Sequence, residues 1–548
     1  MLFRSKCLNF LLFVVVAFVS PGLLWAQNQP VKGKVLDEKT KEALIGVSVL
    51  EAGSTSNGTV TDLDGNFSLS VPEGATLRIS YVGYLVQEIP LNGRKSLEVL
   101  LKEDTEMLDE VVIVGYGVQK KATLSGSVTS IGGEKLANTP VTNVSQGLAG
   151  RLPGVVAISN TAEPGYDGAT IRIRGVNTFG KADPLVVVDG VPGRSLERID
   201  PSTIETMSVM KDASAAIYGA QAANGVIIIT TKRGKKGKPT VNLSYNYGIS
   251  RPTVIPEMAN ASEYATLLNE IDKYAGNKER YTPEDIQKYR DGSDPWSYPN
   301  TDWFKETLKP WSPQTYANAT IDGGTDNMTY FVSVSAKTQD GFYRNSGTKY
   351  NQYDLKSNLD LKLNKYINLF MNLTGRMEDR KYPTRSSENI FRMLMRSKPN
   401  MPAYWPNGLP GPDIEFGDNP VVIATDATGY ERDKRYILNG DFGVNINVPY
   451  VEGLTLKATA SLDKNFRFRK IWQTPWTLYS WDGTSMDENN NPLLVEGKKG
   501  FSDPRLRESM EDNQNILLSG IINYNRTFAE NHSVNVLAGA ERITGKGD

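Results

Sequence analysis

The sequence has almost none of the side chains that most catalytic and metal centres use. Its 548 residues include one cysteine, Cys7, and one histidine, His532. A disulfide needs two cysteines, and the common zinc centres need several cysteines or histidines. A hydrolytic triad needs a well-placed histidine. The sequence therefore predicts no catalytic residue, no metal site and no cofactor. A surface hydrolase that works with carboxylates alone stays open as an alternative.

A strong net charge and long apolar segments are also missing. The formal net charge is −1, so no overall positive field would attract nucleic acid. An apolar run from Leu8 to Val19 follows Arg4 and Lys6 and precedes Ala26. This run is too short for a comfortable membrane span, and its flanks are typical of a secretory signal peptide over residues 1–26. Cleavage there would leave an exported chain without cysteine.

Residues 27–102 contain short strand patterns that are broken by Gly, Asp and Asn turns. We expect strands at 31–36, 45–51, 58–61, 66–71, 77–81 and 97–101. This even spacing predicts a small β-sandwich. The turn at residues 62–66 is similar to the start of a calcium loop, but Phe67 stands where an EF-hand needs glycine. A tight hairpin turn is the better interpretation.

A polar linker with a valine-rich strand, residues 103–117, leads into a Gly-rich region at 118–235. The apolar strand at 110–114 has two interpretations. It is either a buried strand of the following domain or a strand that stays accessible so that another protein can pair with it. Residues 118–235 mix strands, such as 185–189 and 225–231, with short helical pieces, which predicts a small α+β domain.

From residue 240 to 548 the sequence alternates between apolar and polar residues with a period of two. The alternation covers nine segments, at 241–247, 317–321, 328–336, 355–363, 367–373, 438–448, 454–462, 516–524 and 534–540. None of the 41 positions in the apolar register is charged, although 22% of the whole chain is. A charge that faces lipid at mid-depth costs ~2–4 kcal/mol in a membrane barrel. A soluble β-sandwich would also alternate.

The connections between these segments distinguish the two architectures. Short connections near 323–327, 364–366, 449–453 and 529–531 alternate with long ones near 249–313, 339–350, 380–434 and 470–513. Outer-membrane barrels have short turns on the periplasmic side and long loops outside. The alternation of lengths therefore favours a membrane barrel over a sandwich.

The long loops contain helix signals and many aromatic residues. Residues 262–274 fit a helix, and Thr282 and Pro283 fit the N-cap and first position of another. Four tryptophans are the candidate substrate contacts, because flat rings can stack on sugar faces or on apolar solutes; they are Trp296, Trp303, Trp405 and Trp481. Equally, such rings can pack the loops or form an interfacial aromatic girdle.

Several motifs together resemble the SusC-like (SusC/RagA-type) TonB-dependent outer-membrane transporters of Bacteroidetes-type bacteria. The motifs are Leu108-Asp109-Glu110-Val111-Val112-Ile113-Val114-Gly115-Tyr116-Gly117, Ile171-Arg172-Ile173-Arg174-Gly175, Val188-Asp189-Gly190-Val191-Pro192, Lys211-Asp212-Ala213-Ser214-Ala215-Ala216-Ile217-Tyr218-Gly219 and Tyr298-Pro299-Asn300-Thr301-Asp302-Trp303. The resemblance covers essentially the whole exported chain.

The resemblance implies a role for each region. Residues 27–102 would be a carboxypeptidase-regulatory-like domain, residues 118–235 the plug and residues 240–548 part of the barrel. The TonB box would comprise Asp109, Glu110, Val111, Val112, Ile113 and Val114. The implied partners are TonB, energised by ExbB and ExbD, a SusD-like surface lipoprotein, and the outer-membrane lipid. A barrel of the family has 22 strands, so we expect this chain to be an N-terminal fragment.

These observations predict a mainly β fold. It would consist of a small N-terminal β-sandwich, an α+β plug domain and the first part of a transmembrane antiparallel β-barrel with about nine strands. The expected function is TonB-dependent active import of a large nutrient, with oligosaccharide favoured over peptide or other solutes, in a multi-pass protein of the outer membrane. The alternatives are an outer-membrane signal-transducing receptor and a secreted or surface β-rich adhesin.

Overall fold

The computed structural model describes residues 29–52, 57–81, 84–102, 111–114, 117–120, 128–139, 143–159, 161, 163–176, 180–529 and 532–547. The expected signal peptide and two residues of the expected TonB box, Asp109 and Glu110, lie outside them. The chain divides into two compact units, residues 1–112 with 119–124, and residues 113–118 with 125–548. None of the described helices is long and apolar enough to cross a membrane.

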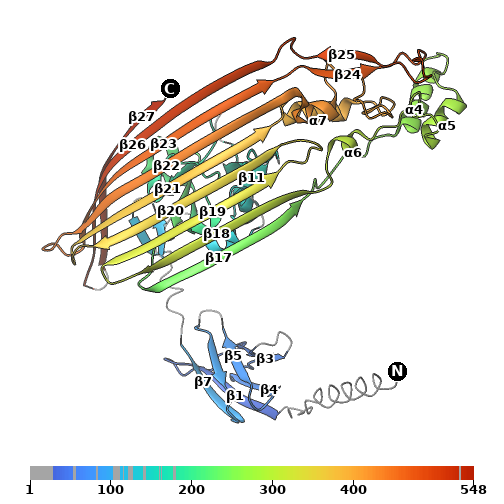
Figure 1. Ribbon diagram of the computed structural model, residues 1–548. Coiled ribbons are helices and arrows are strands. Elements are labelled where there is room, and N and C mark those ends of the chain that lie inside the picture. The colour runs from blue at the N-terminus through green and yellow to red at the C-terminus, as the bar shows by residue number, and fades with distance from the viewer. Residues whose placement is uncertain are drawn as a thin grey trace, which may run out of the picture. The chain divides into compact units, whose positions relative to one another are not determined.

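The first unit is a β-sandwich of two sheets (Figure 1). Its strands are β1 (Gln29–Asp37), β2 (Ser48–Glu51), β3 (Gly58–Val60), β4 (Asn66–Val71), β5 (Thr76–Ser80), β6 (Gln87–Pro90) and β7 (Ser96–Leu101). One sheet has the order β4-β1-β7 and the other has the order β3-β2-β5-β6. The sequence pattern did not reveal β6, because this short edge strand has a single isoleucine among Gln, Glu and Pro.

The alternating apolar residues of the two sheets meet in one core. Val31 and Val35 of β1 and Leu77 and Ile79 of β5 are among its fully buried members. At residues 62–66, the carboxylate of Asp62 accepts hydrogen bonds from the backbone N–H groups of Asp64 and Asn66, and Gly65 has a φ of +76°. This geometry is that of a tight turn, in which the left-handed conformation suits glycine.

The second unit begins with a small α+β domain. Its main sheet has the order β10-β15-β16-β13-β14, and β11 and β12 form a separate hairpin. The elements are β10 (Val128–Gly132), α3 (Gly133–Ala137), η2 (Gln146–Leu148), β11 (Val155–Ser159), β12 (Ala169–Ile173), β13 (Leu185–Val188), β14 (Val191–Pro192), η3 (Pro201–Thr203), β15 (Ile204–Met210), η4 (Asp212–Ala222) and β16 (Val226–Thr231). The short apolar runs of the sequence become its buried strands. A further two-stranded sheet pairs β8 (Val111–Val114) with β9 (Gly117–Lys120).

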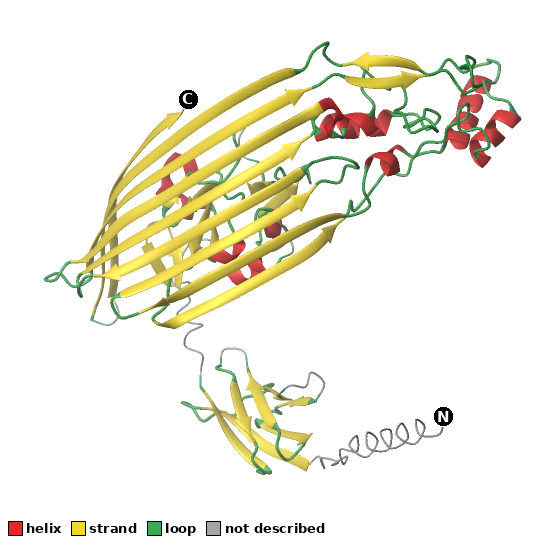
Figure 2. Ribbon diagram, viewed as in Figure 1, coloured by secondary structure: helices red, strands yellow, loops and turns green. Residues whose placement is uncertain are grey.

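A sheet of nine antiparallel strands follows, in which each strand pairs with its neighbours along the chain, apart from the loop hairpin described below (Figure 2). The strands are β17 (Gly237–Ser250), β18 (Ser312–Gly324), β19 (Met328–Asp340), β20 (Lys349–Lys362), β21 (Ile367–Tyr382), β22 (Gly429–Asn447), β23 (Leu454–Gln473), β26 (Arg505–Phe528) and β27 (His532–Gly547). The predicted fold class, with about nine barrel strands, is thereby confirmed. The strands extend well beyond the alternating segments, because their outer ends carry polar residues on both faces.

The long connections gather at one end of this sheet and the short turns lie at the other (Figure 1). The loops contain α4 (Ala261–Tyr274), α5 (Pro283–Asp291), α6 (Trp303–Thr307), α7 (Ser387–Arg396), α8 (Pro420–Ile423), η5 (Asp426–Thr428) and the hairpin of β24 (Trp476–Ser480) with β25 (Val495–Lys499). Capping boxes start α4, at Asn260 and Glu263, and α5, at Thr282 and Asp285. The helix expected after Thr282 begins as predicted, with Pro283 at its first position.

The burial of the nine-stranded sheet is the reverse of that in a soluble protein. On β19, the apolar Val334 is 48% exposed while the neighbouring Ser333 is 2% exposed. On β20, Leu355 is exposed and Gln352 and Asn358 are buried. The polar register is buried because the small α+β domain lies against it, on the inner face of the sheet (Figure 1). The apolar register forms the outer face, which suits contact with hydrocarbon.

Candidate functional site

The small domain is held to the inner face of the sheet by polar contacts, one group of which centres on Arg194. This residue follows the β13–β14 hairpin and Gly193, which has a φ of +83°. Its guanidinium donates to Asp441 of β22 at 2.5 and 3.0 Å, and to Asp463 of β23 at 2.7, 3.1 and 3.2 Å. Burial alone would lower the pKa of Arg194, but the bonds to the two carboxylates more than offset this effect and raise the pKa above its ordinary value. We call these three residues the Arg194 clamp.

A second contact starts from the turn between β13 and β14. Asp189 and Gly190 both have positive φ angles, +52° and +89°, which let the chain reverse within two residues. The Asp189 carboxylate accepts bonds from the backbone N–H and hydroxyl of Thr231 at 2.9 and 2.7 Å, and it pairs with Lys356 of β20 at 3.5 Å. The amide of Asn358 donates to the Thr231 hydroxyl at 2.9 Å. Burial would raise the pKa of Asp189, but Lys356 and Thr231 lower it overall.

A third group of contacts lies along residues 164–200. Arg198 pairs with Asp167 at 2.6 Å, and its guanidinium lies 4.8 Å from the ring centre of Tyr350 on β20. The backbone carbonyl of Arg198 accepts a bond from Gln352 at 2.9 Å. The hydroxyl of Tyr316 on β18 donates to Asp200 at 2.6 Å. The bonds from Gln352 and Tyr316 thus join the small domain to β20 and β18.

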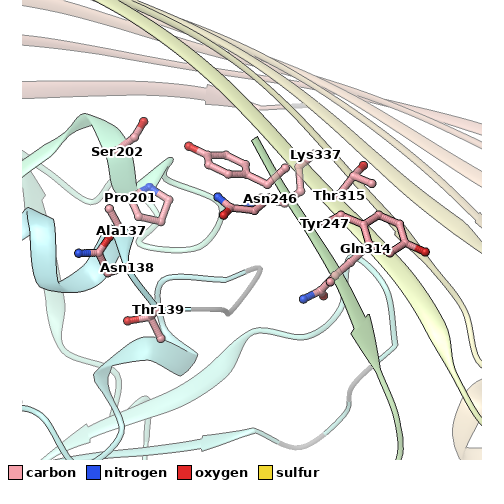
Figure 3. Close-up of a pocket in the computed structure, with 12 residues that line it drawn as sticks. Ala137, Asn138, Thr139, Pro201, Ser202, Asn246, Tyr247, Gln314, Thr315 and Lys337 are labelled. Atoms are coloured by element: carbon pink, nitrogen blue, oxygen red, sulfur yellow. The ribbon is translucent and has the colours of Figure 1, made fainter. Parts of the chain in front are cut away.

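A cavity of about 320 Å³ lies between the small domain and the wall at β17 and β18 (Figure 3). The small domain contributes Ala137, Asn138, Thr139, Pro201 and Ser202 to its lining. The wall contributes Asn246, Tyr247 and Gln314, among others. The domain therefore fills the inside of the sheet without packing tightly against every strand.

The structure brings three of the four candidate tryptophans together in the outer loops. The ring of Trp405 stacks on Trp296 at a centroid distance of 5.5 Å and meets Trp481 edge-on at 6.3 Å; Trp296 and Trp481 are 6.1 Å apart. Trp405 is only 6% exposed, and its indole N–H donates to the carbonyl of Tyr479. Trp296 and Trp481 are half-buried, so part of each ring stays accessible. We call these three residues the tryptophan cluster.

Trp303 lies elsewhere, within the hydrophobic core of the loops. It is 4% exposed and packs with Phe304, Ile390 and Leu394, and its indole N–H donates to the carbonyl of Lys398 at 2.8 Å. The structure therefore places this residue in a packing role.

The structure describes four of the six residues that were expected to form the TonB box. Its residues Val111–Val114 form β8, which pairs with β9 and, in the described part of the chain, with no other strand. A strand has two hydrogen-bonding edges, and β9 occupies one of those of β8.

The sequence alone did not reveal the Arg194 clamp. Asp441 belongs to the polar register that the alternation identified, and Asp463 lies in the same phase of the next strand, but a period of two says nothing about the partner of either carboxylate. The one signal in the sequence was that Asp441 and Asp463 both lie at mid-strand on the inner face, because two buried carboxylates need a positive partner. Among the described residues, no group of three or more His, Cys, Asp or Glu side chains is arranged to hold a metal ion.

Comparison with known proteins gives two domain matches and several relatives. Residues 120–226 match the TonB-dependent Receptor Plug Domain, and residues 31–113 match the CarboxypepD_reg-like domain. TonB-dependent receptor SusC of Bacteroides thetaiotaomicron is 33% identical over 479 residues, which are 81% of this chain and 45% of the relative. TonB-dependent receptor P39 of Formosa agariphila is 31% identical over 540 residues, 97% of this chain and 48% of the relative.

A solved structure of the RagAB peptide importer in the 'open-open' state has the same fold. It superposes with a TM-score of 0.63 at 23% identity, over 80% of this chain and 49% of the other. The chain thus spans about half the length of the proteins that it matches. The relatives are receptors and transporters rather than enzymes, in agreement with the expectation from the sequence. The resemblance found in the sequence is therefore confirmed: the chain belongs to the SusC-like TonB-dependent receptors.

Proposed function

We propose that this chain forms the plug and part of the barrel wall of a transporter that imports a large nutrient across the outer membrane with energy from TonB. The nutrient that we favour is an oligosaccharide. In this proposal residues 1–26 direct export, residues 109–114 are the TonB box, and residues 118–235 close the passage inside the barrel.

The observation that carries the proposal is the reversed burial of the nine-stranded sheet. Its apolar face is exposed and its polar face is covered by the small domain. A soluble adhesin would cover the apolar face instead, because exposed apolar area of that size is unfavourable in water. A lipid-exposed outer face with a plugged polar interior is the arrangement that a gated outer-membrane passage requires.

The way in which the plug is held supports active transport. The plug blocks the inner face and is attached to it by ion pairs and hydrogen bonds, so a pull can replace those bonds by bonds to water. The outer membrane stores no gradient of its own, so the pull must come from TonB, energised by ExbB and ExbD. Strand β8 suits that role, because an extended partner can pair with its second edge through main-chain hydrogen bonds.

The outer loops suit capture of the solute. The tryptophan cluster presents parts of two indole rings in the loops that the long connections form. Flat apolar faces of this kind bind sugar rings by stacking, which supports oligosaccharide as the nutrient. We further propose that a SusD-like surface lipoprotein associates with these loops.

The test is to replace Val112 with proline in the full-length protein, in its own bacterium. Proline removes the backbone N–H that a strand partner needs, so we expect uptake of the nutrient to be abolished while binding at the cell surface persists. The matched control is Val112→Ile, which keeps the N–H and the β-branched side chain. Undiminished uptake by Val112→Pro would contradict the proposed TonB box.

A further inference from the structure

We propose that the inner wall carries a second solute site, an amide-lined furrow that binds an uncharged, hydroxyl-rich chain on its way past the plug. This inference rests on the proposed transport function and adds a binding site to it. The furrow is a cavity of about 380 Å³ that spans β22, β23, β26 and β27. We call the side chains of Asn439, Asp463, Asn465, Asn513 and Asn515 the amide furrow; the rest of the lining is Ile437, Lys464, Gly545, Lys546 and Gly547.

The register of the four strands explains why these side chains converge. Asn439 pairs with Asp463, Asp463 with Asn515, and Asn515 with Gly545. The next row on the same face, two residues away along each strand, pairs Asn465 with Asn513 and Asn513 with Gly547. Side chains two residues apart in a strand point to the same side, so both rows face the interior of the barrel.

Glycines in β27 give the furrow its depth. A Cβ atom at Gly545 would lie 2.9 Å from Oδ1 of Asn515, and a Cβ atom at Gly547 would collide with Oδ1 of Asn513. The two amides therefore reach over strand positions that have no side chain. Larger residues at these glycines would fill the space that the amides now occupy.

The furrow offers both hydrogen-bond donors and acceptors. Each asparagine amide carries two N–H donors and one carbonyl acceptor. Oδ1 of Asn465 is buried and accepts no hydrogen bond within the described part of the chain, while Asn513 and Asn515 are exposed. A hydroxyl group both donates and accepts, so a chain of hydroxyls can satisfy amides of either orientation.

The arginines beside the furrow are already paired within the protein. Arg194 is bound to Asp441 and Asp463, and Arg467 is bound to Asp433 and Glu511. An anionic solute would have to break these pairs before either guanidinium could bind it.

Two lysines of the lining belong to the opposite face of the strands. Lys464 and Lys546 form a cross-strand row with Gln514, between the two rows of asparagines, and Lys464 pairs with Asp512 at 2.6 Å. The inner face of the furrow thus favours an uncharged solute over a sulfated or carboxylated one.

The same surface disfavours a peptide. Among the lining residues, Ile437 is the one large apolar side chain that the described structure places there. A site for a peptide needs apolar pockets for side chains in addition to hydrogen bonds for the main chain. A hydroxyl-rich chain needs hydrogen bonds along its length, which the two amide rows supply.

The furrow also adjoins the plug attachment. Asp463 accepts a hydrogen bond from Asn439 at 2.7 Å and also holds Arg194. A solute in the furrow therefore lies beside the Arg194 clamp. This position suits a site that binds the solute when the plug is displaced from the inner face of the sheet.

The test uses the full-length receptor, purified in detergent, with three uncharged heptasaccharides as probes: maltoheptaose, laminariheptaose and cellulose-derived celloheptaose. An electron cryo-microscopy map at saturating probe should show a sugar chain within hydrogen-bonding distance of Asn513 and Asn515 for at least one of them. For that probe, calorimetry should give about tenfold weaker binding for the double variant Asn513→Leu/Asn515→Leu, because two amide partners are lost.

The matched control is Gln514→Leu, which changes the residue between the two asparagines, on the opposite face of β26. We expect its affinity to stay within about twofold of the wild type, since its side chain does not line the furrow. Two results would overturn the furrow: no sugar density there with any of the three probes, or tighter binding there of a sulfated heptasaccharide or an uncharged nonapeptide. The Val112→Pro uptake assay remains independent, so failure of the furrow and failure of TonB-dependent transport can be told apart.

Discussion

Replacement of Arg194 with methionine should shift the plug strongly toward the displaced state, although Arg194 is a single residue just after a short hairpin. Asp441 is 3% exposed, and Asp463 is 19% exposed. Methionine would keep much of the side-chain volume but would remove the guanidinium that binds both carboxylates. Arg194 accounts for five hydrogen bonds between the plug and the wall, all of which would be lost.

The magnitude follows from the burial of the carboxylates. Removal of one partner from a buried ion pair costs roughly 3–5 kcal/mol, because the remaining charge stays buried and unpaired. Water reaches part of Asp463, so the lower end of this range, about 3 kcal/mol, is appropriate here. With about 1.4 kcal/mol for each factor of ten, the equilibrium between the seated and the displaced plug would shift by about 150-fold.

The assay is the sensitivity of cells to a large antibiotic that an intact outer membrane excludes, combined with limited proteolysis of the plug in isolated membranes. Both should increase for Arg194→Met. The control is the triple variant Arg194→Met/Asp441→Asn/Asp463→Asn, which removes all three charges and should recover most of the exclusion, since a neutral replacement of a buried ion group is often tolerated. Equal leakage from the single and the triple variant, or none from the single variant, would refute the electrostatic explanation.

Three further predictions concern other regions. Trp481→Ala should weaken binding of the imported solute at the cell surface about tenfold without changing the thermal stability of the loops. Trp303→Ala should instead lower the melting temperature of the loops, since loss of a buried tryptophan costs ~3–5 kcal/mol. The opposite pattern in binding and melting experiments would contradict the assignments. In the isolated N-terminal sandwich, hydrogen bonds from Thr40, Tyr84 and Lys39 lower the pKa of the Asp37 carboxyl to about 2. The stability that this carboxylate contributes is therefore present above about pH 4 and is lost as the pH falls through about 2. Chemical denaturation of the Asp37→Asn variant should show no such loss. Burial raises the pKa of Glu163 in the plug to about 7, and Glu431 acts in the same direction. The stability of the folded plug should therefore fall as the pH rises from about 4.5 to about 7, because the folded state favours the protonated carboxyl. Glu163→Gln should abolish that dependence in melting curves.

Part of the candidate site could be predicted from local sequence, and part could not. The helix starts at Asn260 and Thr282 depend on side chains within three residues of each other, so their capping boxes are visible in the sequence. The tryptophans were recognisable as loop aromatics, but the sequence could not separate Trp303 in the loop core from Trp481 at the surface. That distinction depends on contacts between different loops, such as Trp303 with Lys398, 95 residues away, and Trp481 with Trp405.

The sequence by itself determined the nine strands, their two faces and the alternation of short turns and long loops. Period-two alternation and turn residues are local properties, and each strand pairs with its neighbour along the chain. Tertiary structure alone decided which face the plug covers, how Arg194 reaches two carboxylates about 250 residues away, and where four strands bring asparagines into one furrow. The physical reason is that a pattern along one strand fixes the side on which a residue lies, whereas its partner across the interior depends on the curvature of the whole sheet and the fit of the domain inside it.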